Sequence, residues 1–130
     1  MKLEVGMFIR TEYGIRKITE DIGWAFDFDQ SIINEYGDFE DCFDKKYQHL
    51  YVTKASYNII DILEVGDYVN ESIVLGFENK YIEEDDKFVP IGVITENCYL
   101  DNNKSWIIEK DIKTIVTKEE FKLMAYKVGE

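Results

Sequence analysis

Short segments in which hydrophobic and polar residues alternate are the clearest pattern in this chain, and a period of two predicts β-strands. In segment 24–29 (WAFDFD) the side chains of Trp24, Phe26 and Phe28 fall on one face and both aspartates on the other. We expect a strand whose aromatic face is buried. Short β-type runs predict further strands at 7–10, 15–18, 68–70 and 73–77.

Two segments of the first half return in the second half, which predicts an internal duplication. Segment 3–9 (LEVGMFI) reappears as segment 63–69 (LEVGDYV), sixty residues later. Segment 52–57 (VTKASY) matches segment 116–121 (VTKEEF), sixty-four residues later, which predicts a net insertion of four residues in the second half. In each half a glycine, Gly6 or Gly66, precedes the first strand and can supply a turn with positive φ.

Each half is expected to end in a short helix. Segment 117–120 (TKEE) has the spacing of a capping box, and Phe121 and Met124 would then share one helix face. The counterpart begins near Ser56 and points Ile59, Ile60 and Leu63 inward. It leads directly into the second half. We also expect His49 to lie in a strand and segment 125–128 to form a last edge strand.

These elements predict a mainly β (α+β) fold. It consists of two related β-rich halves, 1–62 and 63–130, packed as one compact unit. Each half is expected to be an SH3-like or similarly curled small sheet with one short helix.

Charge narrows the classes of partner. The 130-residue chain has 27 acidic and 15 basic residues and a formal net charge of −12. Such a charge opposes direct binding to nucleic acid and to anionic membranes, because phosphate contacts dominate nucleic-acid affinity. Cys42 and Cys98 fit neither a disulfide framework nor a zinc site, and no membrane span or signal peptide is recognisable. We therefore expect a cytoplasmic protein with half-buried thiols.

The sequence carries no recognisable catalytic motif. It lacks GxGxxG, Walker A, HExxH and GxSxG patterns, and its single histidine is His49. Asp27, Asp29 and Ser31 have the spacing that opens an EF-hand loop, but Ile32 stands where that loop needs glycine. We therefore expect no enzyme, no cofactor and no metal, with a bound cation as a minor alternative.

Acidic residues are the strongest positive feature. Between Ile18 and Asp44 there are nine of them and no lysine or arginine, and segment 83–86 (EEDD) occupies the corresponding place in the other half. These clusters are either a solvated surface or a nucleic-acid mimic that occupies a basic groove, with Tyr36, Phe39 and Phe43 as apolar anchors. On the second interpretation the partner-binding residues are Tyr36, Asp38, Phe39, Glu40, Asp41, Asp44, Glu83, Glu84, Asp85 and Asp86.

Segments 56–70 (SYNIIDILEVGDYVN) and 112–121 (IKTIVTKEEF) resemble small uncharacterised proteins carried by phages and prophages of low-GC Gram-positive bacteria. The resemblance covers most of 56–70 and 105–128 and leaves out the acidic segment of the first half. It implies a phage accessory protein that acts against host defence or host regulation.

Together with the charge, this resemblance predicts an inhibitor that binds a basic host protein. The expected target is a nucleic-acid enzyme such as a CRISPR effector or another defence nuclease. One alternative is a protein that sequesters a nucleotide signal between its halves, with Arg10, Arg16 and Lys17 meeting phosphates. Another is a structural or assembly role in the virion.

Overall fold

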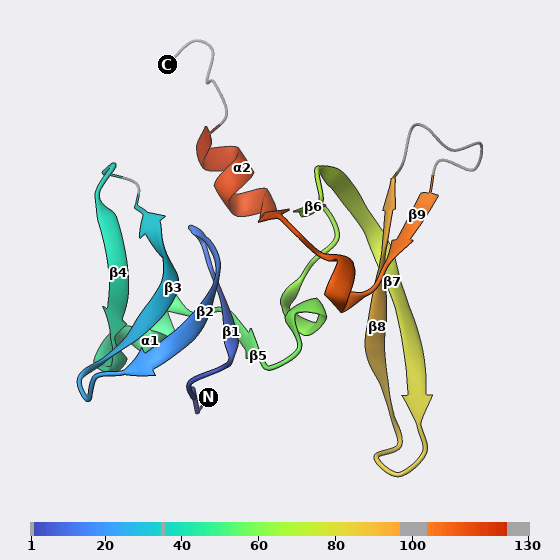
Figure 1. Ribbon diagram of the computed structural model, residues 1–130, viewed down its shortest axis with the longest axis horizontal. Coiled ribbons are helices and arrows are strands. Elements are labelled where there is room, and N and C mark those ends of the chain that lie inside the picture. Colours follow the sequence, from blue (N-terminus) through green and yellow to red (C-terminus); the bar gives the residue numbers. More distant parts are fainter. Residues whose placement is uncertain (1, 35, 97–103, 125–130) are drawn as a thin grey trace.

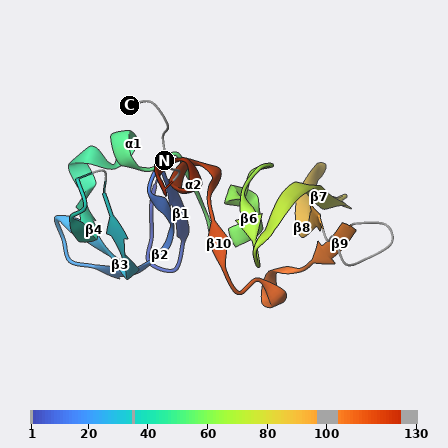
Figure 2. The same cartoon turned by 90° about the horizontal axis from the view of Figure 1, so that it is seen from above.

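The computed structural model describes residues 2–34, 36–96 and 104–124 and consists of two five-stranded antiparallel sheets that lie side by side (Figures 1 and 2). The strands of the first sheet are β1 (Phe8–Thr11), β2 (Gly14–Asp21), β3 (Ala25–Ile33), β4 (Phe39–Asp44) and β5 (Lys54–Ser56). Those of the second are β6 (Tyr68–Val69), β7 (Ser72–Ile82), β8 (Lys87–Glu96), β9 (Lys104–Ile107) and β10 (Ile115–Val116). The mainly β fold with two halves is confirmed.

Both halves have the same topology. The strand orders are β4-β3-β2-β1-β5 and β9-β8-β7-β6-β10, so each is a four-stranded meander whose fifth strand returns to pair with the first. Helical turns precede that return: η1 (Lys45–Tyr47) and α1 (Gln48–Tyr51) in the first half, and η3 (Glu109–Asp111) in the second. The likeness of each sheet to an SH3-like sheet stays a prediction.

The repeated segment 3–9 and 63–69 forms the same turn twice. Gly6 and Gly66 have φ of +96° and +99°, a backbone conformation that glycine adopts at little cost. The Gly6 N–H donates to the Ile18 carbonyl at 2.8 Å, and the Gly66 N–H donates to the Val74 carbonyl at 3.0 Å. Each glycine therefore supplies the predicted turn with positive φ before the first strand of its half.

The predicted insertion of four residues is wrong. Ser56 pairs with Phe8, and Val116 pairs with Tyr68, so β5 and β10 correspond at the same separation of sixty residues as the repeated turn. Val52 precedes β5, whereas Val116 lies within β10. Segments 52–57 and 116–121 are therefore similar in sequence but do not occupy equivalent places in the two halves.

Strand β3 begins one residue later than the alternation predicts. Phe26 and Phe28 are buried as expected, but Trp24 lies outside the strand with 61% of its surface exposed. The cause is the preceding bend at Gly23, where φ is +94°. His49 was also predicted wrongly, because it lies exposed in α1 and not in a strand.

Both predicted helices form near their expected positions. The Thr117 N–H donates to Glu120 Oε1 at 2.8 Å and the Glu120 N–H donates to Thr117 Oγ1 at 3.2 Å, which confirms the capping box at the start of α2 (Lys118–Met124). The counterpart is a short 3₁₀ helix, η2 (Ile59–Ile62), which Asn58 caps. Cys98, Glu35, the side chain of Met124 and the expected strand at 125–128 lie outside the described residues.

The two halves share apolar surface along β1 and β2. Ile9 and Ile18 belong to the first core, together with Leu3, Phe26, Phe28, Ile32, Phe43 and Val52. Ile15, also on β2, belongs to the second core with Ile60, Ile62, Leu63, Val69, Val74, Val93 and Ile107, and Phe8 packs against that core. One hairpin therefore supplies residues to both cores, and η2 is part of the second core.

An ion pair buried between the halves adds to this contact. Arg10 on β1 donates from Nη1 and Nη2 to the two carboxylate oxygens of Asp67 at 2.6 and 2.7 Å, and to the Ile62 carbonyl at 3.0 Å. The side chains of Arg10 and Asp67 are 1% and 0% exposed. Glu119 on α2 also accepts from Arg10 at 2.6 Å, so three separate segments meet at one guanidinium.

The surroundings of Arg10 stabilise its charge. Burial lowers the pKa of the Arg10 guanidinium, but the hydrogen bonds and negative charges of Asp67 and then Glu119 outweigh burial, so the pKa is raised above its ordinary value. Asp67 also accepts the N–H groups of Glu64 at 2.7 Å and Lys118 at 3.0 Å. Its carboxylate thereby connects the start of the second half to the start of α2.

Removal of the Asp67 carboxylate should strongly destabilise the fold. Asp67→Ala leaves the Arg10 charge buried without its bidentate partner, and we expect the free energy of unfolding to fall by about 3–5 kcal/mol. Lys46→Ala, which removes an exposed pair with Asp44 at 4.0 Å, should change it by less than about 1 kcal/mol. Urea denaturation followed by tryptophan fluorescence measures both. Equal losses in the two variants would contradict the structural importance of the buried pair.

Glu64 should make stability depend on pH in the acid range. Burial raises the pKa of Glu64, but hydrogen bonds from Lys118 and Lys54 and the charge of Arg10 lower it to about 2 from an ordinary value of 4.5. The folded protein then binds fewer protons than the unfolded chain between these two values. Stabilisation by ionised Glu64 is therefore complete above 4.5 and is lost as the pH falls toward 2.

We accordingly expect the wild type to exceed Glu64→Gln in free energy of unfolding by a constant amount between about pH 7 and pH 5. The difference should narrow steadily as the pH falls further. Urea denaturation of both proteins at a series of pH values measures it. A difference that stays unchanged down to about pH 3 would show that the ionisation of Glu64 does not contribute.

Candidate functional site

The turn between β3 and β4 presents two aromatic side chains to solvent. Tyr36 is 80% exposed and Phe39 is 74% exposed. The Asn34 side chain accepts the N–H groups of Tyr36 at 2.9 Å and Asp38 at 3.0 Å, and Gly37 adopts a φ of +83°. The backbone that carries both aromatics is therefore held in place by a side chain of the same turn.

The predicted acidic residues of this hairpin differ in how far they are engaged. Glu40 accepts the Tyr51 hydroxyl at 3.2 Å, Asp41 accepts the Ser31 hydroxyl, and Asp44 caps η1 through the Lys46 N–H at 3.0 Å. Asp38 is exposed and, among the described residues, its carboxylate has no hydrogen bond or ion pair. Of the four predicted acidic residues of this hairpin, Asp38 is therefore the one most available to a partner.

The pKa of the Cys42 thiol is sensitive to the carboxylates that lie near it on this hairpin. Burial and then the charges of Asp27, Asp41, Glu40 and Asp44 raise the pKa of the half-buried Cys42 thiol above its ordinary value. Asp27 pairs with Cys42 across the sheet, and Glu40, Asp41 and Asp44 are near it on β4, so negative charge is concentrated on this part of the hairpin. Glu40, Asp41 and Asp44 thus lie close together with Asp27, which the sequence analysis did not include, and their part in partner binding stays a prediction.

Phe43 was predicted as an apolar anchor, and this is wrong. It is buried in the first core, where its ring centroid lies 5.7 Å from that of Phe26 and 5.6 Å from that of Phe28. The inward face of β4 takes Phe43, which leaves Tyr36 and Phe39 as the exposed aromatics of the acidic hairpin.

The second acidic cluster forms the turn between β7 and β8. Glu83, Glu84, Asp85 and Asp86 are all exposed, and the Tyr81 hydroxyl donates to Asp86. Phe88 is 70% exposed and its ring lies 5.2 Å from that of Tyr81. This aromatic pair was not predicted. Its signal in the sequence is the same as in the first half, where aromatics flank the acidic residues of a hairpin.

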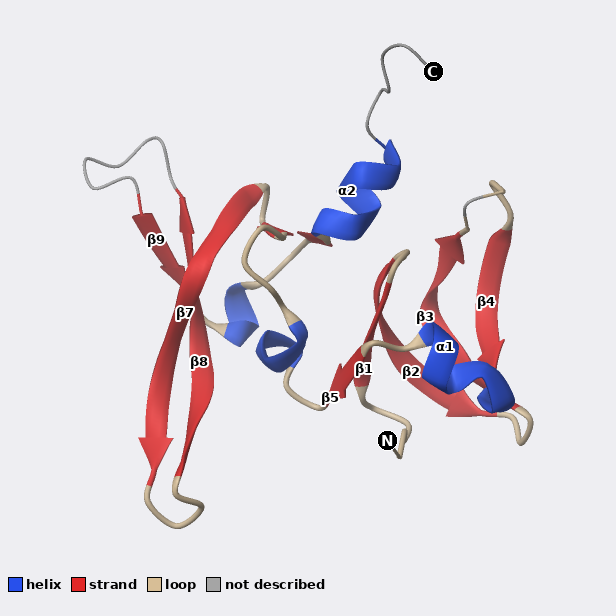
Figure 3. Ribbon diagram, turned by 180° about the vertical axis from the view of Figure 1, so that it is seen from behind, coloured by secondary structure: helices blue, strands red, loops and turns tan. Residues whose placement is uncertain are grey.

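The two acidic clusters lie at opposite ends of the molecule. The β3–β4 turn and the β7–β8 turn point in opposite directions from sheets at the two ends of the long axis (Figures 1 and 3). They do not form one continuous surface. A partner that contacts one turn leaves the other free for a control variant.

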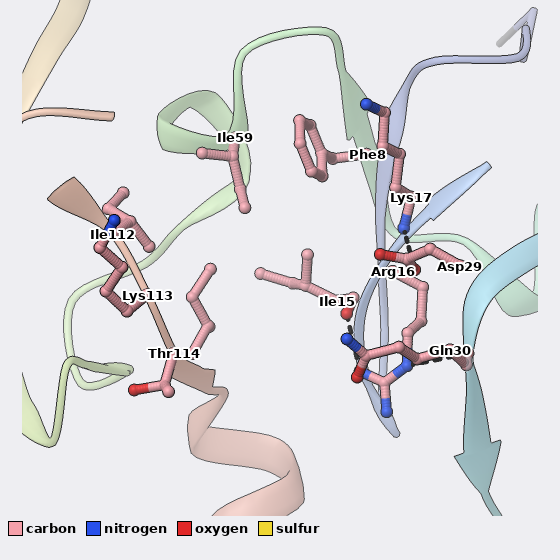
Figure 4. Close-up of a pocket in the computed structure, with 11 residues that line it drawn as sticks. Phe8, Ile15, Arg16, Lys17, Asp29, Gln30, Ile59, Ile112, Lys113 and Thr114 are labelled. Carbon is pink, nitrogen blue, oxygen red and sulfur yellow. Dashed lines mark hydrogen bonds between the residues drawn. The ribbon is translucent and has the colours of Figure 1, made fainter. Parts of the chain in front are cut away.

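A pocket of about 360 Å³ lies between the halves, lined by β1, β2 and β3 on one side and by Ile59 and residues 112–115 on the other (Figure 4). Arg16 and Lys17 line it, as the ligand-binding alternative predicts, and Lys113 joins them. Arg10 was predicted wrongly as a phosphate contact, because its guanidinium is buried against Asp67. Lys113 was missed, since nothing in the sequence places it beside β2.

Residues 2–34, 36–96 and 104–124 contain no group of three or more His, Cys, Asp or Glu side chains that could hold a metal ion. No helix in this part of the chain is both long and apolar enough to cross a membrane.

Comparisons with known proteins give no relative for this chain. No family model, no curated protein and no solved structure matches it.

The thiol of Cys42 allows the acidic hairpin to be probed in solution. In a Cys98→Ser background, Cys42 should react with the neutral reagent iodoacetamide along a pH profile shifted above the ordinary thiol pKa of 9.0. Adding Asp27→Asn and Asp41→Asn should move the profile to lower pH, because two of the charges that disfavour the thiolate are gone.

The matched control is Glu84→Gln with Asp85→Asn on the other hairpin, which removes the same charge far from Cys42 and should leave the profile in place. A profile that moves equally in both variants would mean that the effect comes from net charge and not from carboxylates gathered around Cys42.

Proposed function

We propose that this protein binds a basic surface on a host nucleic-acid-binding protein through the β3–β4 hairpin and thereby blocks that surface. The observation that carries the proposal is the exposure of Tyr36 and Phe39 beside Asp38, on a turn that its own hydrogen bonds hold. Aromatic side chains are the usual anchors of protein interfaces, while charged groups around them steer association and select the partner.

Charge complementarity defines the class of partner. The chain has a net charge of −12, and the carboxylates around Cys42 concentrate negative charge on the same hairpin that exposes the aromatics. A basic groove that binds nucleic acid is built to meet closely spaced negative charges. Carboxylates held on a folded hairpin can occupy such a groove in place of phosphates. The protein itself, for the same reason, should not bind nucleic acid.

The inhibitory direction of the proposal rests on the expectation, made from segments 56–70 and 112–121, that this is a phage accessory protein. A phage accessory protein that occupies the nucleic-acid groove of a host defence enzyme would prevent that enzyme from binding its substrate. A CRISPR effector or another defence nuclease is the target class that combines a basic groove with this purpose.

The hairpin is tested with two variants of matched charge. One carries Asp38→Lys and Asp41→Lys, and the other carries Glu83→Lys and Glu84→Lys. Each substitution changes the charge by two, so both variants go from −12 to −8. Glu40 is left unchanged because its carboxylate accepts the hydroxyl of the half-buried Tyr51, whereas the bond between Asp41 and Ser31 is exposed. The tagged proteins are used for pull-downs from nuclease-treated host lysate, and retained proteins are identified by mass spectrometry.

We expect the wild type and the β7–β8 variant to retain one nucleic-acid-binding protein that the β3–β4 variant loses. Added duplex DNA or raised salt should release it, because both compete for the basic surface. Circular dichroism and a melting curve establish that the β3–β4 variant is folded. Retention that is equal in all three proteins, or that DNA does not reverse, would refute binding at this hairpin.

A further inference from the structure

The pocket between the halves has the opposite charge from the rest of the protein. Acidic residues outnumber basic ones by 27 to 15 in the chain, yet the pocket is lined by three basic residues, Arg16, Lys17 and Lys113, and one acidic residue, Asp29. The electrostatic potential in this pocket should therefore attract a small anion, which the acidic hairpins repel.

Two of these cations, Lys17 and Lys113, form no ion pair with the described residues of the protein. Elsewhere, Arg10, Lys45, Lys54 and Lys118 have carboxylate partners within 3.0 Å. Among the described residues, neither Lys17 nor Lys113 has an ion pair. The Lys17 ammonium instead lies 5.6 Å from the centre of the Phe8 ring, at the pocket wall. Both ammonium groups can therefore meet an anionic ligand.

Arg16 adds a charge that is held in position. Its guanidinium donates to the carbonyls of Ile15 at 2.7 Å, Gln30 at 3.2 Å and Ser31 at 3.0 Å. A guanidinium has five N–H groups, so each terminal nitrogen keeps one N–H. Nη1 lies at Gly14 on the same side as the Glu120 carboxylate, which leaves the second N–H of Nη2 for a ligand. Because the carbonyls already fix the side chain, little rotamer entropy is lost when this N–H binds.

The rest of the pocket suits an apolar or aromatic body. The side chains of Phe8 and Ile15 face Ile59 and Ile112 across it (Figure 4). The Asp29 carboxylate accepts the Lys17 N–H at 3.0 Å through one oxygen, which leaves the other able to accept from a hydroxyl or amino group. A volume of about 360 Å³ lies near the lower end of the range for small-molecule pockets and fits one nucleotide better than two.

We propose that this pocket binds a small organic phosphate with an aromatic body, of the chemical class of a mononucleotide. Arg16 would contact the phosphate at the end of the pocket near Gln30, and Lys17 and Lys113, on other sides of the pocket, would attract the anion through their charge (Figure 4). The wall of Phe8 and Ile15 would contact the ring, and Asp29 would accept from a hydroxyl or amino group. The proposal uses no residue of the β3–β4 turn or of β4, so it stands or falls independently of the partner-binding function.

Isothermal titration calorimetry tests the site with AMP, GMP, CMP and UMP, each titrated separately into the full-length protein. Adenosine and inorganic phosphate serve as partial ligands. We expect at least one mononucleotide to bind with a Kd below about 1 mM, and about tenfold or more tighter than either partial ligand. The test variant is Lys17→Met with Lys113→Met, which keeps the apolar stems and removes both ammonium groups.

The test variant should weaken mononucleotide binding by about tenfold or more. Lys80→Met with Lys87→Met removes the same charge from the β7–β8 hairpin and should bind like the wild type. Absence of mononucleotide binding to the wild type at about 1 mM would overturn the proposal, as would equal weakening in both variants. Inorganic phosphate that binds as tightly as the best mononucleotide would overturn the assignment to an organic phosphate.

Discussion

The arrangement of this protein depends on one buried ion pair, that between Arg10 and Asp67. A buried guanidinium is tolerable only when its donors are satisfied and its charge is balanced. Asp67 and Glu119 of the second half balance the charge, and together with the Ile62 carbonyl they accept its N–H groups. The pair determines how β1 of the first half lies against the first turn of the second half. It also positions α2, since Glu119 and the Lys118 N–H belong to the same network. The pocket wall formed by residues 112–115 follows from this arrangement.

The local parts of the fold could be predicted from the sequence because their causes are local. Gly6 and Gly66, the capping box of Thr117 and Glu120, and the alternation of Phe26 and Phe28 each act within a few residues. Trp24 was misplaced because the bend at Gly23 interrupts the alternation before β3 begins. His49 was misplaced because a four-residue helix offers too short a pattern to distinguish from a strand.

Contacts between distant residues could not be predicted in the same way. Arg10 in an acidic chain looks like a ligand contact, and only the fold shows that Asp67 takes both of its terminal nitrogens. Lys113 is fifty or more residues away from every other basic residue of the pocket, and it comes near Arg16 and Lys17 only because the halves pack together. The two clusters of acidic residues could be recognised from the sequence alone. Which carboxylates remain free, and which aromatic side chains stay exposed, depends on the partners that folding assigns to Glu40, Asp41 and Phe43.

Arg10 and Asp67 occupy non-equivalent positions of the topology that the two halves share. At a separation of sixty residues, Asp67 corresponds to Met7 and Arg10 corresponds to Asn70. Asn70 bonds its own half, because it accepts the N–H groups of Lys113 and Thr114 and donates to the Asp111 carbonyl. If the two halves had identical sequences, the surface of the first half that binds the second would also be present on the second half. That surface could bind a third unit in the same way, and the series would continue. With methionine at one position and asparagine at the other, neither a carboxylate nor a guanidinium is present to continue the series, so the contact ends at two units, as capping repeats end a solenoid.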